Sequence, residues 1–237
     1  MKLKQILLGC LIVLGVSCQS EAQESNTLSK TEKAEGWELL FDGETTKGWR
    51  FFKGGEVEGW KVEDGILCNS GVGSDHGGDI ITTEKFKDFE LYLEWKVDPL
   101  SNSGVFYRVE ELDSIRAIYE SAPEYQISDG TNDVNPNTLA SQLTGSNYAM
   151  NRPINAVTKP LDEWNTTRII IKGSHVEHWL NGTKVVEYEL GSEDWLRRKE
   201  ASKWKTRPYY GIAEEGHIGL QDHGGLTCFR NIKIKRL

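Results

Sequence analysis

The stretch FELYLEWKV, residues 89–97, decides the fold. Every second residue is apolar: Phe89, Leu91, Leu93, Trp95 and Val97. The residues between them are polar or charged, with Tyr92 as the one aromatic among them. A period of two is typical of a β-strand that buries one face in a core and turns the other outward. The stretch therefore predicts a long, half-buried strand.

Short runs of the same kind continue along most of the chain from Trp37. They are GWKVEDGILC (59–68), NSGVFYRV (102–109), EYQIS (124–128), TRIIIKG (167–173), HVEHWLNGTKVVEYEL (175–190) and CFRNIKI (228–234). Asp64-Gly65 and Asn181-Gly182 predict hairpin turns. One helix is expected near residues 193–204, with Ser192 as its N-cap. Many strands, one late helix and no alternation of strands with helices predict an all-β sandwich or jelly roll of two antiparallel sheets.

The composition is that of a soluble globular domain with an acidic surface. The chain has 36 acidic and 28 basic residues among 237, and its net charge of −8 argues against binding nucleic acid. Eight Trp, eight Tyr and 24 Gly are typical of a turn-rich β-fold. The sequence has no G-x-S-x-G, H-E-x-x-H, P-loop or dinucleotide-binding motif, which argues against the chemistry of each.

The N-terminus predicts an exported protein. Residues 1–18 combine two early lysines with an apolar run, and Gly15-Val16-Ser17-Cys18 resembles a lipobox, in which Cys18 would carry lipid. Gln19 favours the outer membrane, and ordinary cleavage near Ser17 is the alternative. The polar residues 19–35 predict a flexible tether, and residues 36–237 one domain. Cys68 and Cys228 form either a disulfide or two buried thiols.

Strand alternation predicts where polar side chains gather. Assigning Val105, Tyr107, Val109, Tyr125, Ile127, Ile218 and Leu220 to the core leaves their neighbours on the outer face. Those neighbours are Arg108, Glu124, Gln126, Gln221 and His223. In GHIGLQDHGG (216–225), Gly219 would leave room for a ligand to approach that face. We therefore expect a polar site on one sheet, bordered by the long loop of residues 129–160.

Several stretches, in this order, carry a resemblance to a known family. They are ELLFDGETTKGW (38–49), GWKVEDGIL (59–67), NSGVFYRV, EYQISD (124–129), DEWN (162–165), HWLNGTKVVEYEL (178–190) and GHIGLQDHGG followed by FRNIKI. Together they resemble the 3-keto-disaccharide hydrolase domain family over residues 36–237. The resemblance implies a concanavalin- or laminin-G-like jelly roll that cleaves 3-keto-glycosides by proton abstraction beside the keto group, elimination of the aglycone and hydration. It also implies a carbohydrate substrate supplied by a separate sugar 3-dehydrogenase, and in some members a divalent metal.

The resemblance and the phase argument together suggest roles for individual residues. Catalytic candidates are Arg108, Glu124, His178 and His223; substrate-binding candidates are Gln126, Tyr148 and Gln221; and His178 with Glu124 is the candidate metal pair. His178 is also in phase with Val176 and Leu180, which would make it a packed core histidine. Trp195 and Trp204 are expected to anchor the helix. Weaker candidates are His217 and Asp222, whereas His76 and His175 are expected to be functionally neutral.

Two other classes of function stay open at this point. A non-catalytic carbohydrate-binding module shares the expected fold, and a structural lipoprotein would need no site. A binding module is expected to present an exposed aromatic platform without ionisable groups at its centre. The ionisable residues of the predicted polar face favour the enzyme. In all three cases the only expected membrane contact is the lipid anchor.

Overall fold

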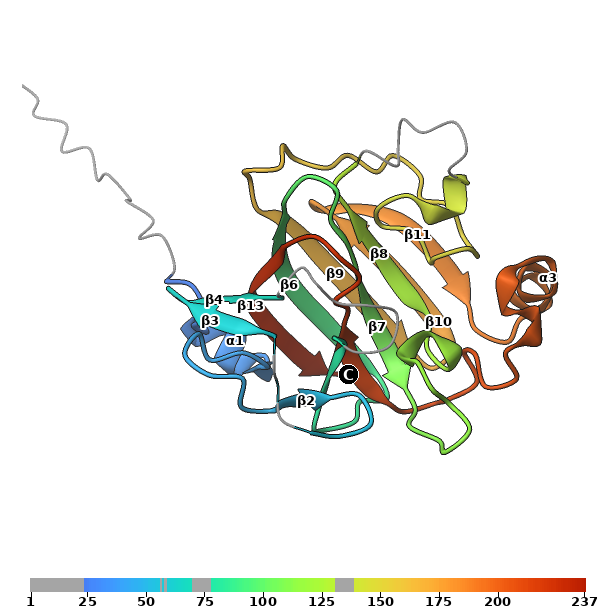
Figure 1. The fold of residues 1–237 in the computed structure, drawn as a ribbon, viewed down its shortest axis with the longest axis horizontal. Helices are drawn as coiled ribbons and strands as arrows, with labels where there is room; N and C mark the ends of the chain where they lie inside the picture. Colours follow the sequence, from blue (N-terminus) through green and yellow to red (C-terminus); the bar gives the residue numbers. More distant parts are fainter. Residues whose placement is uncertain (1–23, 56, 58, 70–77, 131–138) are drawn as a thin grey trace, which may run out of the picture.

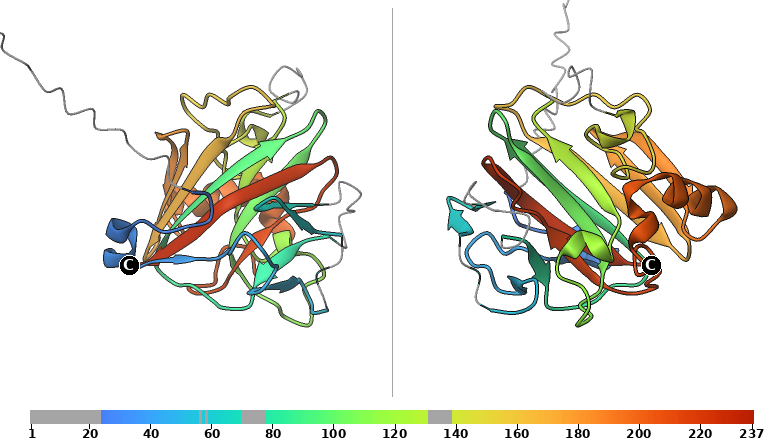
Figure 2. Two further views of the ribbon diagram at one scale, coloured as in Figure 1. Left: turned by 90° about the vertical axis from the view of Figure 1, so that its left-hand side faces the viewer. Right: turned by 45° about the vertical axis from the view of Figure 1, so that its right-hand side comes forward.

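Two antiparallel sheets stacked face to face form the protein (Figures 1 and 2). The computed structural model describes residues 24–55, 57, 59–69, 78–130 and 139–237, so the signal segment, Cys18 and His76 lie outside the described residues. None of the helices in the described part of the chain is long and apolar enough to cross a bilayer. The larger sheet has the order β11-β10-β9-β6-β13-β4-β3, with β1 also paired to β13, and the smaller one the order β2-β5-β12-β7-β8. The prediction of an all-β jelly-roll sandwich is confirmed.

The strands have the following bounds. In the larger sheet they are β1 (Trp37–Leu39), β3 (Lys61–Glu63), β4 (Ile66–Cys68), β6 (Phe89–Val97), β9 (Asn165–Lys172), β10 (His175–Leu180), β11 (Thr183–Glu189) and β13 (Thr227–Arg236). In the smaller sheet they are β2 (Trp49–Phe51), β5 (Ile80–Thr82), β7 (Asn102–Val109), β8 (Glu124–Ser128) and β12 (His217–Leu220). The helical segments are α1 (Lys30–Ala34), α3 (Glu193–Ala201) and the 3-10 turns η1 (Ile118–Glu120), η2 (Ala140–Gln142) and η3 (Lys203–Thr206).

β6 behaves as its sequence predicts. It pairs with both β9 and β13, and its five alternating apolar side chains are at most 3% exposed. They belong to the main core between the sheets, which also takes Val105 and Tyr107 from β7 and Ile218 and Leu220 from β12. The core is therefore built from one face of each sheet, as strand alternation requires.

The predicted hairpin turns and the predicted helix cap are also present. Asp64-Gly65 and Asn181-Gly182 have positive φ at both residues and join β3 to β4 and β10 to β11. The Ser192 hydroxyl accepts a hydrogen bond from the Trp195 backbone N–H at the start of α3. Trp195 and Trp204, each 2% exposed, lie in the main core and anchor the helical segment beside β11 (Figure 1).

A β-bulge in β7 changes the expected alternation. Phe106 pairs with Gly219 and Val109 with His217, so Tyr107 and Arg108 lie opposite the single residue Ile218. Arg108 has a φ of +56°, and the backbone of Gly216 is so close that a Cβ there would lie 2.3 Å from the Arg108 carbonyl carbon. The bulge moves Val109 to a second cluster outside the smaller sheet, so its predicted place in the main core is wrong.

That second cluster also occupies the space above Gly219. Its buried members are Ile81, Phe106, Val109, Ile118 and Ala122. A Cβ on Gly219 would lie 2.3 Å from the Ile118 Cδ1 atom. The glycine therefore makes room for a side chain of η1 and not, as predicted, for a ligand. One half of the outer face is closed by this packing, and the half around Glu124 stays open.

The segment expected to be a tether is ordered where the structure describes it. In residues 24–35, Ser29 and Glu32 form a capping box on α1. The Asn26 side chain is buried, donates to the Gly65 carbonyl at 2.8 Å and accepts from the Asn231 N–H at 2.9 Å. The predicted flexible tether is wrong for these residues, because hydrogen bonds and not apolar burial attach them to the sheet.

A disulfide joins Cys68 of β4 to Cys228 of β13, which are paired in register and lie 160 residues apart in the sequence. The structure thus resolves the alternative left open by the sequence. Both cysteines are on strands of the larger sheet, so the bond closes a loop that contains most of the domain.

We expect the Cys68→Ala/Cys228→Ala double variant to keep the fold but to lose about 2–5 kcal/mol of unfolding free energy, because the long loop is no longer constrained in the unfolded chain. Urea unfolding of the oxidised wild type and of the variant measures the difference. Wild type treated with a reducing agent should match the variant. Equal midpoints for all three samples would show that the bond contributes nothing to stability.

Candidate functional site

An open pocket of about 390 Å³ lies on the outer face of the smaller sheet. Its lining residues are Asn102, Tyr119, Glu124, Gln126, Tyr148, Lys203, Trp204, Arg207, Gln221 and His223. β7, β8 and the end of β12 provide the floor, and η1, η3 and the segment after η2 provide the walls. The structure therefore brings together five of the sequence-predicted residues: Glu124, Gln126, Tyr148, Gln221 and His223.

Glu124 is the buried acidic group of this pocket. It is 5% exposed, and its carboxyl lies over Gly104 of β7, where an added Cβ would come within 2.5 Å of Oε1. No hydrogen bond to its carboxyl is found among the described residues. Burial raises the pKa of Glu124 to about 8, with a further increase from Asp79 and an opposing effect from Lys203. The carboxyl is therefore mostly neutral at pH 7, which makes it a proton donor.

Amide groups surround this carboxyl. Gln126, 2% exposed, donates from Nε2 to the Asn102 Oδ1 at 2.8 Å. Gln221 is 7% exposed, and its side-chain amide makes no hydrogen bond to the described residues. These groups offer donors and acceptors to hydroxyl groups of a bound molecule.

Aromatic and cationic side chains form the walls. Tyr119 and Tyr148 are half-buried, and the Lys203 ammonium lies 4.3 Å from the centre of the Tyr148 ring. Arg207 is ion-paired with Glu120 at 3.4 Å. Trp204 is fixed behind them by stacking on Tyr210, with ring centres 4.6 Å apart. The walls thus combine rings that can stack on a sugar with positive charge that can stabilise an anion.

The segment after η2 is held against β8 like an additional strand. Gly145 donates to the Gln126 carbonyl at 2.9 Å, Gln126 to the Ser146 carbonyl at 3.1 Å, and Tyr148 to the Glu124 carbonyl at 3.0 Å. These bonds fix Tyr148 beside Glu124. The prediction that the long loop borders the site is thus confirmed for its described part, residues 139–160.

His178 does not line the pocket, so that prediction is wrong. It is fully buried, with Nδ1 3.1 Å from the Gly145 carbonyl and Nε2 2.8 Å from the Tyr107 hydroxyl. Burial lowers the pKa of His178 to about 4, so the ring is neutral. Because a carbonyl only accepts, Nδ1 carries the proton and Nε2 accepts from Tyr107. This is the packed histidine that its phase with Val176 and Leu180 indicated.

Arg108 is also outside the pocket. The bulge turns its side chain to a different cavity, where it donates from Nη2 to the Gly173 and Lys87 carbonyls at 2.7 and 3.2 Å. The Asp88 carboxylate lies 3.7 Å from the same nitrogen. The prediction that Arg108 joins Glu124 in one site is wrong, because the extra residue in β7 breaks the alternation on which it depended.

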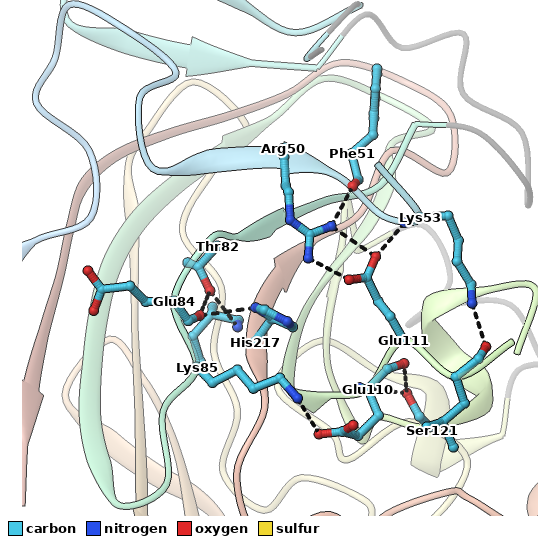
Figure 3. Close-up of polar contacts among 12 residues, drawn as sticks. Arg50, Phe51, Lys53, Thr82, Glu84, Lys85, Glu110, Glu111, Ser121 and His217 are labelled. Atoms are coloured by element: carbon cyan, nitrogen blue, oxygen red, sulfur yellow. Dashed lines mark hydrogen bonds and ion pairs between the residues drawn. The ribbon is translucent and has the colours of Figure 1, made fainter. Parts of the chain in front are cut away.

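His217 belongs to a structural cluster at the closed half of the face (Figure 3). Its Nδ1 lies 3.1 Å from the Glu84 carbonyl. Nearby, Arg50 binds both oxygens of Glu111, and Lys85 pairs with Glu110 at 2.9 Å. These ion pairs attach β2 and β5 to the segment after β7. The other weak candidate, Asp222, is 2% exposed and accepts from Asn69 at 3.0 Å.

The proposed metal pair does not fit a metal ion. Both ring nitrogens of His178 are engaged with protein groups, so it has no lone pair for a ligand bond beside Glu124. Within the described residues, the side chains with metal-ligand spacing are His175, Glu177 and Glu187. That group is already neutralised in part by Lys184, which pairs with both carboxylates.

Five pocket residues escaped the sequence argument: Asn102, Tyr119, Lys203, Trp204 and Arg207. Asn102 is two residues before Gly104 on the outer face of β7, a phase that the sequence did show. Lys203 and Arg207 lie in and just after a basic run, which alone indicates only a solvated helix face. Their place in the pocket depends on how η3 docks, which no local pattern encodes.

Comparison with known proteins gives the family. Residues 36–235 match the 3-keto-alpha-glucoside-1,2-lyase-like domain. The chain belongs to this family. It is 34% identical to a 3-keto-disaccharide hydrolase of Bacteroides thetaiotaomicron over 95% of this chain and 87% of that protein. The family resemblance read from the sequence is therefore confirmed.

Solved structures agree with this assignment. A "putative glycosyl hydrolase" of Parabacteroides distasonis is 40% identical with a TM-score of 0.83, covering 90% of this chain and all of that one. A second so described from that organism is 29% identical with a TM-score of 0.68, covering 85% and 99% of the two chains. The β-glucanase of Bacillus licheniformis, 9% identical with a TM-score of 0.50 over 85% and 97% of the chains, shares the fold alone.

The raised pKa of Glu124 predicts a pH dependence of stability. Between the ordinary pKa of 4.5 and about 8, the folded chain holds a proton that the unfolded chain has released. Stability must then fall as pH rises through this window. We expect Glu124→Gln to flatten the fall by several kcal/mol, at about 1.4 kcal/mol per pKa unit.

Urea unfolding at pH 5 and pH 8 measures this effect, and Glu163→Gln, at an exposed site, is the control. The control should follow the wild type. Parallel curves for wild type and Glu124→Gln would contradict the raised pKa.

Proposed function

We propose that the protein is a carbohydrate-active hydrolase that cleaves 3-keto-glycosides in the pocket around Glu124. Family membership and the 3-keto-disaccharide hydrolase relative support the reaction class. The observation that carries the proposal is a buried carboxyl with a pKa near 8 in a pocket of amides and half-buried tyrosines. A pure sugar-binding module has no use for such a group at its centre.

The sugar would bind between the two tyrosines and the floor. Tyr119 and Tyr148 line the wall, and the side-chain amides of Gln126, Gln221 and Asn102 would bind the hydroxyl groups of the sugar from the floor. About 390 Å³ is within the usual range of small-ligand sites. The pocket is open, so the aglycone extends into solvent or along the rim.

Cleavage begins with proton removal at C2, which the neighbouring 3-keto group acidifies. His223, exposed on the pocket rim, is the base, since imidazole is a common general base near neutral pH. The electron pair of the C–H bond moves to the keto oxygen and forms an enediolate. Lys203 and Arg207 supply the positive charge that stabilises it.

Glu124 completes the elimination. As the C1–O bond breaks, its neutral carboxyl gives a proton to the leaving oxygen, and a C1–C2 double bond conjugated with the ketone remains. Water then adds to C1 and gives a proton to the Glu124 carboxylate, and protonated His223 returns a proton to C2. Both groups recover their starting state, and the net reaction is hydrolysis.

We also propose that the chain is an outer-membrane lipoprotein attached through Cys18, because residues 15–18 resemble a lipobox. It would act after a sugar 3-dehydrogenase, because a 3-keto sugar is formed by oxidation of a sugar hydroxyl. Mass spectrometry of membrane-extracted protein should find lipid on Cys18. A mature N-terminus that begins after residue 18 without lipid would contradict the anchor.

Replacing the acid should slow cleavage according to the leaving group. Glu124→Gln is expected to lose about 100- to 10,000-fold in kcat/KM on a 3-keto-glycoside with an alkyl aglycone. A nitrophenyl aglycone, which leaves without a proton, should restore most of the rate. Wild-type activity on the alkyl glycoside should fall as pH rises through about 8, as the neutral carboxyl disappears.

His175→Ala, a surface change on β10, serves as the control and should have wild-type activity. Two results together would show that Glu124 is the base and not the acid. Wild-type activity would rise through pH 8, and Glu124→Gln would slow cleavage of the alkyl and nitrophenyl glycosides by the same factor. If the wild type binds sugars but never cleaves the keto form, the protein is a binding module.

A further inference from the structure

A second cavity, of about 490 Å³, lies around Arg108 and is separate from the Glu124 pocket. Its walls come from the β9–β10 turn, α3 and residues 211–214. Leu196 and Ile212 line it although they are 53% and 61% exposed, and Trp195 and Leu190 contribute further apolar surface. Exposed apolar side chains around a cavity that holds a cation indicate a ligand with two different ends.

The position of Arg108 is energetically unfavourable in two respects. It is 5% exposed, and its backbone lies in the left-handed region that arginine rarely adopts. Both hydrogen bonds of its guanidinium come from Nη2, and the buried Nε has no partner among the described residues. A guanidinium holds five N–H donors, and those on Nε and Nη1 have no hydrogen-bond acceptor among the described residues.

A second donor in the same cavity has no partner either. The Trp195 Nε1 is buried and makes no hydrogen bond within the described part of the chain. Buried donors are nearly always paired, and two exceptions in one cavity point to an acceptor that binds there. The rim charges of Lys87 and Glu214 pair with each other at 3.0 Å. The Asp88 carboxylate lies 3.7 Å from the Arg108 Nη2, beyond hydrogen-bond distance, so it partly balances the charge of the guanidinium without taking one of its N–H donors.

We propose that this cavity binds a small monocarboxylate with an apolar body. The carboxylate would take the donors of Arg108, with Trp195 as a further donor, and the hydrocarbon part would cover Leu196 and Ile212. A single buried guanidinium and apolar walls suit one negative charge, whereas a phosphate dianion would need a second cation.

Isothermal titration with acetate, butanoate, hexanoate and octanoate tests the proposal on the whole protein. Each added methylene is expected to tighten binding roughly threefold to fourfold until the walls are covered. Hexanamide, which has the same apolar body and no charge, should bind at least tenfold more weakly than hexanoate.

Two variants locate the site. Leu196→Glu puts a negative charge on the exposed side of α3 and should weaken hexanoate at least tenfold, whereas Leu161→Glu, at an exposed leucine before β9, should leave it unchanged. Arg108→Gln should also lose at least tenfold, and if it does not fold, Leu196→Glu decides. Three results would overturn the proposal. They are carboxylate affinity that does not change from acetate to octanoate, hexanoate affinity equal to that of hexanamide, and hexanoate binding that is unchanged in Leu196→Glu.

Discussion

Burial of the Glu124 carboxyl against Gly104 sets the chemistry of the pocket, because a carboxyl removed from water keeps its proton. Two neighbouring strands create this arrangement. β8 carries Glu124 on its outer face, and β7 offers a residue without a side chain beneath it. The amides of Gln126 and Gln221 continue the same floor. Such a site costs stability as the pH rises from about 4.5 to about 8, because the folded chain keeps a proton that the unfolded chain releases.

The bulge at Tyr107 and Arg108 divides the outer face of the smaller sheet into regions with different tasks. Before the bulge, the face is open around Glu124. At the bulge, Phe106 and Val109 join η1 in a closed apolar cluster, and Arg108 turns to a separate cavity. One extra residue thus separates two polar groups that a regular strand would have placed together. Trp195 lines the Arg108 cavity and Trp204 lines the Glu124 pocket, and both indole rings stack on Tyr210. The two regions therefore share one aromatic support.

The sequence predicted those features that depend on local periodicity and turn chemistry. The alternation of residues 89–97, the Asp64-Gly65 and Asn181-Gly182 turns and the Ser192 cap all appear in the structure. The same alternation placed Glu124, Gln126 and Gln221 correctly, because β8 is regular and the Gln221 N–H continues the pairing beyond β12 by donating to the Gly104 carbonyl at 3.1 Å. It failed for Arg108, since a bulge shifts the phase without a clear local signal. Asn26 and Lys203 escaped it because long-range hydrogen bonding and the docking of η3 decide their positions.

Acid catalysis by Glu124 requires its carboxyl to be neutral in the free protein, and a carbon-13 NMR titration of selectively labelled glutamate carboxyls measures this directly. We expect one resonance to titrate with a pKa near 8 and to disappear in Glu124→Gln. A spectrum in which every glutamate carboxyl has ionised below pH 6 would contradict the claim. Glu124 would then be a carboxylate at neutral pH and could not donate the proton that the leaving group needs.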